Sequence, residues 1–197
     1  TMMRNMMAAV LVVCTVLTSG TGCTLIIGGD GDGGGSTDLS SLAGTDFLAV
    51  VTQGGGSGSY SIMAEDGTVY KTLDSFTTNN VSLTAAGDSV YIFGRSGQNW
   101  IRKYDLSAPD TPLWEYSAKW SWETDPSPSA VVIVSDSVGY IFRLYSSVAW
   151  IINPSAADEA SFITGIITDL VPYETDGNPV NPTCAMLDGT TMYVVLE

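Results

Sequence analysis

Carboxylates are the most numerous residues of this chain that could do acid–base chemistry: the sequence has 21 aspartates and glutamates and no histidine. Within this sequence, that removes Ser-His-Asp and Cys-His catalysis as well as histidine metal sites. A carboxylate-only hydrolysis needs two acids that face each other across a substrate. The adjacent acidic pairs fit other roles: Glu65-Asp66 is typical of a hairpin turn and Asp158-Glu159 of a solvated loop. The sequence therefore predicts no catalytic residue.

Three further aspartates, Asp88, Asp136 and Asp188, open similar motifs that lie 48 and then 52 residues apart. At recurring positions they could act as ligands around a central channel. However, Asp-Ser and Asp-Gly pairs favour the tight turn between two adjacent strands, so we predict turn residues. The sequence also has no phosphate loop, no CxxC pair and no dinucleotide fingerprint, and it predicts neither a cofactor nor a metal site.

The spacing of these motifs indicates repeats of one supersecondary unit. Short runs of β-forming residues, separated by Gly, Asp, Asn and Pro, predict that each unit is a four-stranded antiparallel meander. The expected strands of the two complete units are 81–85, 90–94, 99–105 and 112–118, then 129–134, 138–144, 147–152 and 161–168. Three upstream strands (47–53, 59–65, 68–73) and two downstream strands (183–187, 191–196) belong to further units. The fold class is all-β.

Tandem four-stranded units of this length are typical of β-propellers. From Phe47 to Glu197 the chain resembles extracytoplasmic β-propeller-repeat proteins of bacteria, although it lacks the Gly-His and Trp-Asp signature of the best-known propeller repeat. The resemblance implies a β-propeller-like domain over residues 46–197. Thirteen expected strands are fewer than the roughly 16 of a four-bladed propeller, so we expect a fragment of a longer reading frame. The alternatives are an open stack of sheets and closure by oligomerisation.

The N-terminus has the layout of an export signal over residues 1–22: Arg4, then an uncharged run from Met6 to Leu17, then small residues before Cys23. The uncharged run is too short to span a bilayer as a helix. Because of Cys23, the segment resembles a bacterial lipoprotein signal, with Gly20 where that family usually has leucine. The resemblance implies palmitate on Cys23 and an outer-membrane or cell-surface location. The alternative is an ordinary signal peptide and a secreted or periplasmic protein.

Residues 23–45 are rich in glycine and aspartate and predict a flexible tether rather than a calcium site, because the spacing of an EF-hand is absent. The chain has three cysteines. Cys14 belongs to the expected signal and Cys23 to the lipid site, so no disulfide framework is available. Cys184 lies in an apolar strand, and we predict that it is a small buried hydrophobic residue and not a nucleophile.

The candidate binding surface is a cluster of aromatic residues: Trp114, Tyr116, Trp120 and Trp122. Strand alternation places Trp114 with Tyr116 on one face, and Trp120 with Trp122 on one face of the segment that follows. Such pairs can stack on a sugar ring or anchor a protein partner. The competing interpretation is that they pack between neighbouring sheets.

A net charge of −14 makes nucleic acid an unsuitable partner, because phosphate backbones repel a polyanion. The leading functional hypothesis is therefore a non-enzymatic binding or scaffold module for a protein or carbohydrate ligand, held at a membrane by its lipid anchor. The alternative is an extracytoplasmic enzyme whose catalytic residues lie outside this sequence.

Overall fold

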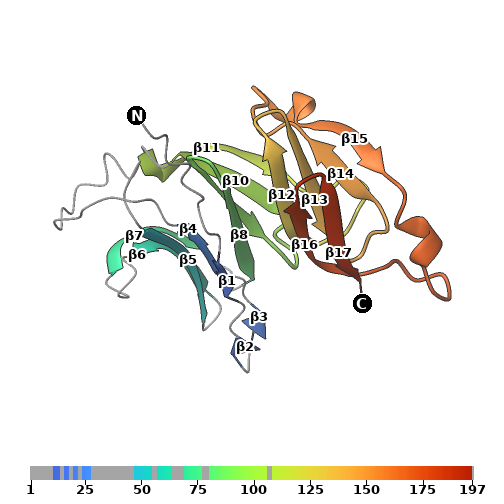
Figure 1. The fold of residues 1–197 in the computed structure, drawn as a ribbon, viewed down its shortest axis with the longest axis horizontal. Helices are drawn as coiled ribbons and strands as arrows, with labels where there is room; N and C mark the ends of the chain where they lie inside the picture. The colour runs from blue at the N-terminus through green and yellow to red at the C-terminus, as the bar shows by residue number, and fades with distance from the viewer. Residues whose placement is uncertain are drawn as a thin grey trace, which may run out of the picture.

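The structure is a computed structural model that describes residues 80–105 and 108–196 together with seven strand segments before them. Side chains in those earlier strands are described at residues 58–61 and at Phe76. The described chain is all-β, as predicted (Figure 1). Its two helical segments are single 3₁₀ turns of three residues each, η1 (Glu159–Ser161) and η2 (Val171–Tyr173). No helix among the described residues is long and apolar enough to cross a bilayer.

The two complete repeats form four-stranded antiparallel sheets whose strands follow one another in chain order. We call them the second sheet and the third sheet. The second sheet consists of β8 (Val81–Ala86), β9 (Ser89–Gly94), β10 (Trp100–Asp105) and β11 (Ala108–Ser117). The third sheet consists of β12 (Pro128–Ser135), β13 (Val138–Arg143), β14 (Ala149–Ile152) and β15 (Ile163–Ile167). These strands confirm the predicted meanders.

The fourth sheet is the hairpin of β16 (Pro182–Asp188) and β17 (Thr191–Leu196). The first sheet has the order β1-β4-β5-β6-β7. Its strands are β1 (Leu11–Val13), β4 (Thr24–Ile27), β5 (Phe47–Gly54), β6 (Ser57–Met63) and β7 (Val69–Phe76), and a separate pair joins β2 (Val16–Leu17) to β3 (Gly20–Thr21). Strand β4 lies within the span assigned to the tether; the rest of that span, Cys23 and residues 28–45, lies outside the described residues.

Tight turns join the first two strands of each repeat, as the aspartate motifs predict. Asp88 follows Gly87, whose φ of +54° suits glycine, in the two-residue turn between β8 and β9. Asp136 lies in the equivalent turn after β12, and Asp188 ends β16 before a similar turn. The turn role is therefore confirmed for all three.

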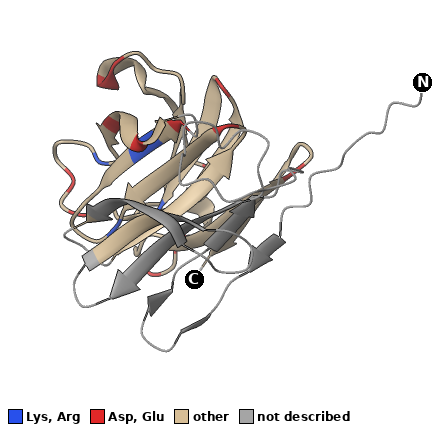
Figure 2. Ribbon diagram, turned by 90° about the vertical axis from the view of Figure 1, so that its left-hand side faces the viewer, with Lys and Arg blue, Asp and Glu red and all other residues tan. Residues whose placement is uncertain are grey.

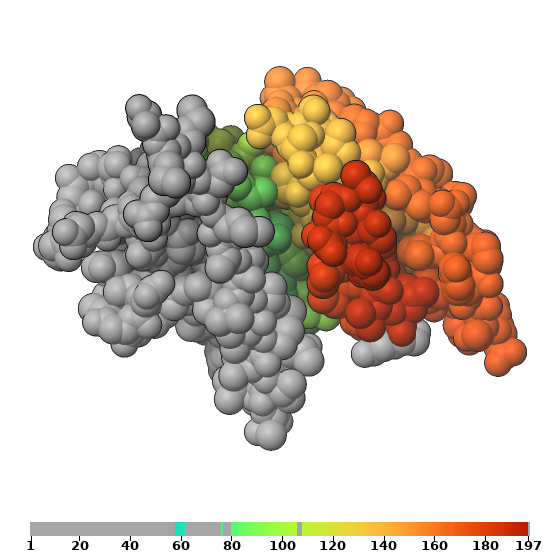
Figure 3. Space-filling model, in the orientation of Figure 1, coloured from blue at the N-terminus to red at the C-terminus, as the bar shows by residue number. Residues whose placement is uncertain are grey.

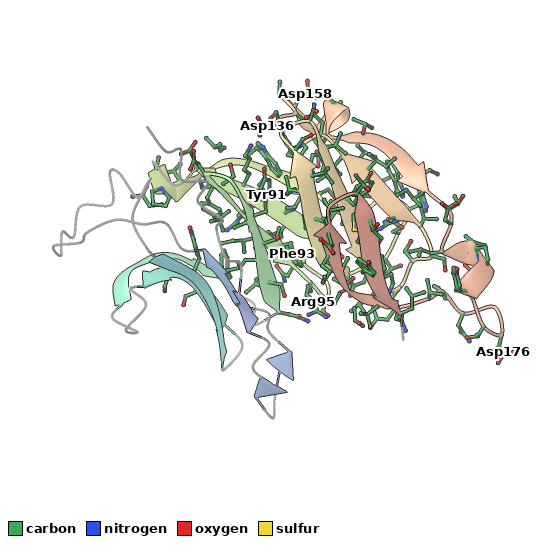
Figure 4. All side chains as sticks on the ribbon, in the orientation of Figure 1. Tyr91, Phe93, Arg95, Asp136, Asp158 and Asp176 are labelled. Atoms are coloured by element: carbon green, nitrogen blue, oxygen red, sulfur yellow. The ribbon has the colours of Figure 1, made fainter. Side chains whose placement is uncertain are left out.

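Of the two adjacent acidic pairs, the structure describes Asp158-Glu159 but not Glu65-Asp66. Asp158 and Glu159 are exposed in a loop, also as predicted, at the start of η1. The Asp158 carboxylate accepts hydrogen bonds from the Ser161 hydroxyl (2.8 Å) and backbone N–H (2.9 Å), which lower the pKa of Asp158. Figure 4 shows Asp158 and Asp136 near the same end of the molecule. Glu65-Asp66 lies outside the described residues.

The core lies between the sheets, which pack face to face. Between the second and third sheets, Tyr91 and Phe93 of β9 join a buried cluster that contains Ile141 of β13 and Trp150 of β14 (Figure 4). Trp150 is 0% exposed. Because side chains alternate along a strand, the neighbours of these residues point to the opposite face of each sheet. Every sheet in the middle of the stack thus has two apolar faces to bury.

The other face of the third sheet packs against the fourth sheet. Its buried residues are Ala130, Val132, Phe142 and Ala149, and the side chains of β16 and β17 that pack on them are Ala185, Leu187, Met192 and Val194. The first strands of successive repeats lie beside one another, β8 next to β12 and β12 next to β16. The stacking order of the sheets is therefore the order of the repeats.

Cys184 corrects one prediction, because the thiol is exposed and not buried. The prediction relied on the apolar character of the strand, which is real. In the structure, however, described residues cover only one face of β16, and Cys184 alternates with the partly buried residues Ala185 and Leu187 of that face. The thiol therefore points to the uncovered face.

Buried hydrogen bonds connect the second repeat to the third and the third to the fourth. The Ser147 hydroxyl, between β13 and β14, accepts a bond from the backbone N–H of Val180 (3.1 Å) just before β16. In the preceding repeat, the Asn99 side chain, between β9 and β10, accepts a bond from the backbone N–H of Ser127 (2.9 Å) just before β12. Each bond fixes the point at which the chain enters the next sheet.

We expect the substitution Ser147→Ala to destabilise the protein by about 1–3 kcal/mol, because it leaves the buried N–H of Val180 without an acceptor. Ser155→Ala, at an exposed turn of the same repeat, is the matched control and should change stability by no more than about 0.5 kcal/mol. Urea unfolding followed by circular dichroism measures both. Equal unfolding midpoints for the two variants would contradict the role assigned to Ser147.

Candidate aromatic binding site

Two of the four predicted site residues, Trp114 and Tyr116, lie side by side on β11. Their rings stack with centroids 4.6 Å apart, so the predicted shared face is correct. Both rings contact Phe162 of the next repeat, and the Tyr116 hydroxyl donates to the carbonyl of Ala156 (3.1 Å). This pair therefore packs the outer strand of the second sheet against the third sheet.

The other two, Trp120 and Trp122, lie in the connection that leads from β11 to β12. Their rings are also stacked, with centroids 5.2 Å apart and planes 10° from parallel. The ring centroid of Trp120 lies 4.8 Å from that of the buried Trp150, whereas Trp122 is 75% exposed. The three indoles thus form a ladder that begins in the core and ends at an exposed ring, and the two stacked pairs do not form one surface.

Next to Trp150 lies a buried charge, that of Arg143, which the sequence does not predict. The side chain of Arg143, at the end of β13, is 1% exposed and lies over the Trp150 ring with its guanidinium carbon 4.3 Å from the centroid. Its Nη1 donates to both carboxylate oxygens of Glu123 (2.7 and 2.8 Å), and Nη2 donates to the Ser146 hydroxyl (3.1 Å). The ion pair and the ring face together compensate for the burial of the guanidinium.

Two opposing effects, burial and the charge of Glu123, act on the pKa of Arg143. Burial lowers it, because the charged form is poorly solvated in the interior, and the charge of Glu123 opposes that effect. An arginine titrates so far above neutral pH that Arg143 stays protonated. Glu123 is therefore the neutralising partner of a permanent buried cation, which makes it unsuitable as a free catalytic acid or base.

Glu123 also holds the tryptophan segment in shape. Its carboxylate accepts a bond from the backbone N–H of Trp120 (2.7 Å), and its own N–H donates to the Trp120 carbonyl (3.1 Å). The ammonium of Lys119 reaches the Thr124 carbonyl (3.4 Å) across the same turn. The exposed indole of Trp122 is therefore carried on a turn that is already ordered, which reduces the entropy lost on binding a ligand.

This arrangement can recognise a flat apolar surface. Among the described residues, no group of three or more Cys, Asp and Glu side chains could hold a metal ion. The acidic residues of the described ribbon lie mostly in loops and turns and few basic residues accompany them, so anionic ligands would be repelled (Figure 2). An exposed indole suits the face of a neutral sugar ring or an uncharged side chain of a partner.

The ion pair could be suspected from the sequence only in part. Arg143 directly follows the apolar run that ends at Phe142, and an arginine there is unusual for a buried strand. Nothing in the sequence indicates its partner, because Glu123 lies 20 residues earlier in a polar loop. Glu123 and Arg143 meet because the connection from β11 to β12, which carries Glu123, passes the end of β13, where Arg143 lies.

No protein-family model and no curated protein matches the chain. Among solved structures, the chain is similar to two computationally designed proteins. The first is Ika8, with 7% identity and a TM-score of 0.45 over 77% of this chain, which spans 43% of the length of Ika8. The second is Ika4, with 12% identity and a TM-score of 0.39, covering 81% of this chain and 97% of Ika4. These likenesses identify neither a family nor a function.

We expect Glu123→Gln to destabilise the protein by about 1–3 kcal/mol, somewhat less than the ~3–5 kcal/mol for a wholly buried pair, because Glu123 is partly exposed. The physical reason is that Arg143 keeps its charge and loses the anion that balances it. Thermal or urea unfolding measures the loss.

The double variant Glu123→Gln with Arg143→Met tests that reason. Replacing the buried cation with an apolar side chain should recover part of the lost stability. If the double variant is no more stable than Glu123→Gln alone, the buried charge is not the source of the effect.

Proposed function

We propose that this protein is a non-enzymatic, membrane-tethered extracytoplasmic binding module with a β-propeller-like architecture, and that its ligand is a neutral carbohydrate held on Trp122. The observation that carries the proposal is the exposed indole of Trp122 on a turn that Glu123 and Arg143 hold in place. The alternative partner for the same indole is an uncharged surface of another protein.

The architectural part of the proposal is supported by the way the repeats associate. Each complete repeat is a four-stranded antiparallel meander, successive sheets pack face to face, and their first strands lie side by side. These are features of propeller blades arranged around an axis. The resemblance of the sequence to bacterial propeller-repeat proteins points the same way.

The carbohydrate part is supported by the contrast among the aromatic residues. Trp114, Tyr116 and Trp120 contact the core between the sheets, so packing accounts for them. Trp122 contacts Trp120 and is otherwise exposed, so packing does not account for such a large side chain. Indole rings bind the apolar face of pyranose rings, and a neutral sugar is not repelled by the acidic chain.

We expect Trp122→Ala to reduce the affinity for a neutral oligosaccharide by at least about tenfold, the equivalent of ~1.4 kcal/mol, while the unfolding midpoint stays within the error of the wild type. Isothermal titration calorimetry with cello-, malto- and chito-oligosaccharides provides the measurement. Tyr173→Ala is the matched control, because Tyr173 is a similarly exposed aromatic residue (63%) in a different loop. The proposal fails if none of these sugars binds, or if the two variants lose affinity equally.

The membrane tether depends on Cys23 and is supported by the resemblance of residues 1–23 to a lipoprotein signal. A lipidated N-terminal cysteine followed by a glycine-rich tether would keep the folded sheets close to a membrane and still free to reach a ligand.

To test the lipid anchor, we expect the expressed wild-type protein to incorporate radiolabelled palmitate and the Cys23→Ser variant to incorporate none. Cys184→Ser, which changes the exposed cysteine of β16, is the control and should retain the label. Incorporation that is unchanged in Cys23→Ser would place the lipid elsewhere, and no incorporation in the wild type would exclude this anchor.

A further inference from the structure

A second exposed aromatic ring, that of Tyr145, lies on a turn that is bonded to the connection that carries Trp122. Tyr145 is 59% exposed and belongs to the turn between β13 and β14. Its backbone N–H donates to the carbonyl of Pro126 (3.3 Å). The preceding N–H, that of Leu144, donates to the carbonyl of Ser127 (2.9 Å). Because Pro126 and Ser127 end the connection from β11 to β12, two main-chain hydrogen bonds join the two segments.

One buried side chain, that of Arg143, binds both segments as well. Its Nη1 donates to the carboxylate of Glu123, which directly follows Trp122. Its Nη2 donates to the hydroxyl of Ser146 (3.1 Å), which directly follows Tyr145. Each of the two exposed rings is therefore next in sequence to a residue that the same guanidinium holds.

Packing inside the molecule does not account for the ring of Tyr145. In the part of the chain that the structure describes, this side chain belongs to neither of the buried clusters between the sheets. Its turn is nevertheless closed by its own bonds. The N–H of Ser146 donates to the carbonyl of Arg143 (3.3 Å), and the Ser146 hydroxyl accepts a bond from the N–H of Val148 (3.2 Å). Like Trp122, Tyr145 is thus an exposed ring on an ordered turn, which reduces the entropy lost on binding.

Both turns lie at the same end of the third sheet. Strand β13 starts just after Asp136, which Figure 4 labels at the upper end of the molecule, and the strand ends at Arg143. The turn of Tyr145 follows there, and Glu123 reaches the same arginine. The faces of the third sheet are covered by its neighbours, one of them by the hairpin β16–β17, which is red in Figure 3. A ligand can therefore meet both rings at this end of the sheet, away from the covered faces.

We propose that Trp122 and Tyr145 are two subsites of one binding site, and that its ligand is a linear chain of several neutral sugars. This inference rests on the proposed function, because it takes Trp122 as a sugar-binding ring. An aromatic ring stacks on the apolar face of one pyranose, so two rings on separate turns contact two sugars of the same chain. Once the first contact is made, the second is intramolecular, and affinity rises with chain length until both rings are occupied.

Isothermal titration calorimetry with a chain-length series of one sugar, from the monosaccharide to the hexasaccharide, tests the proposal on the full chain. For the wild type, the association constant should rise at least about tenfold along the series. Tyr145→Ala should lose most of that rise and bind the monosaccharide like the wild type. Tyr173→Ala is the matched control and should keep the rise, because Tyr173 is a tyrosine of similar exposure (63%) in the connection after β15.

Tyr145→Phe separates stacking from a contact of the hydroxyl. It keeps the ring and should bind the hexasaccharide with an affinity within about twofold of the wild type. Urea unfolding of each variant shows whether a loss of affinity comes from a loss of structure.

A measurement on the wild type needs no variant at all. Nitration by tetranitromethane, assigned to individual tyrosines by mass spectrometry, reports whether the ring of Tyr145 is covered. A saturating concentration of the hexasaccharide should slow the nitration of Tyr145 at least about threefold and leave that of Tyr173 unchanged.

The outcomes separate this inference from the proposed function. If the hexasaccharide binds through Trp122 but Tyr145→Ala keeps the full rise in affinity, the two-ring site is wrong and the proposed function stands. Equal nitration of Tyr145 with and without bound hexasaccharide overturns the inference in the same way. If no sugar of any length binds, or if Trp122→Ala binds every length like the wild type, the proposed function fails and this inference fails with it.

Discussion

The structure depends on one constraint, which is that a sheet with two apolar faces must lie between two others. The third sheet meets it: Ile141 and Trp150 face the second sheet, while Val132 and Phe142 face the fourth. Neighbouring sheets are joined by side-chain packing and by a few buried hydrogen bonds to the entering chain, such as that of Ser147. Face-to-face burial of apolar side chains thus determines the order and the spacing of the repeats.

The stacking of the sheets also determines where the candidate site lies. To begin the next sheet, the chain must travel from an outer strand, β11, back to a first strand, β12. The connecting segment passes the end of β13, where Arg143 is buried, and there it supplies both the carboxylate of Glu123 and the ring of Trp120. A segment that must be ordered to cover a buried charge is a rigid support for the exposed ring next to it.

Local features of the fold could be predicted from the sequence, and features that depend on neighbouring segments could not. Turn residues and alternation identify the strands of the two complete repeats, because both are properties of a few consecutive residues. The exposure of Cys184 depends on whether another sheet covers β16, and the pairing of β4 depends on β5. The partner of Arg143 likewise comes from another connection. The shared faces of the aromatic pairs were predictable, but not that the rings of each pair would stack or which ring would be exposed.

Two groups of exposed apolar residues in the described chain differ in origin, and the repeats tell them apart. The equivalents of Tyr193 and Val195 are buried in the second sheet, and in the third sheet Phe142 is buried and Tyr140 is partly buried, so the exposure of Tyr193 and Val195 reflects a face that no described residue covers. Trp122 lies in a connection outside the sheets, and Glu123 holds its turn through the backbone N–H of Trp120 and the guanidinium of Arg143. A surface that repeats an interior interface favours another protein sheet as its partner. An exposed ring that no sheet position requires favours a small ligand instead.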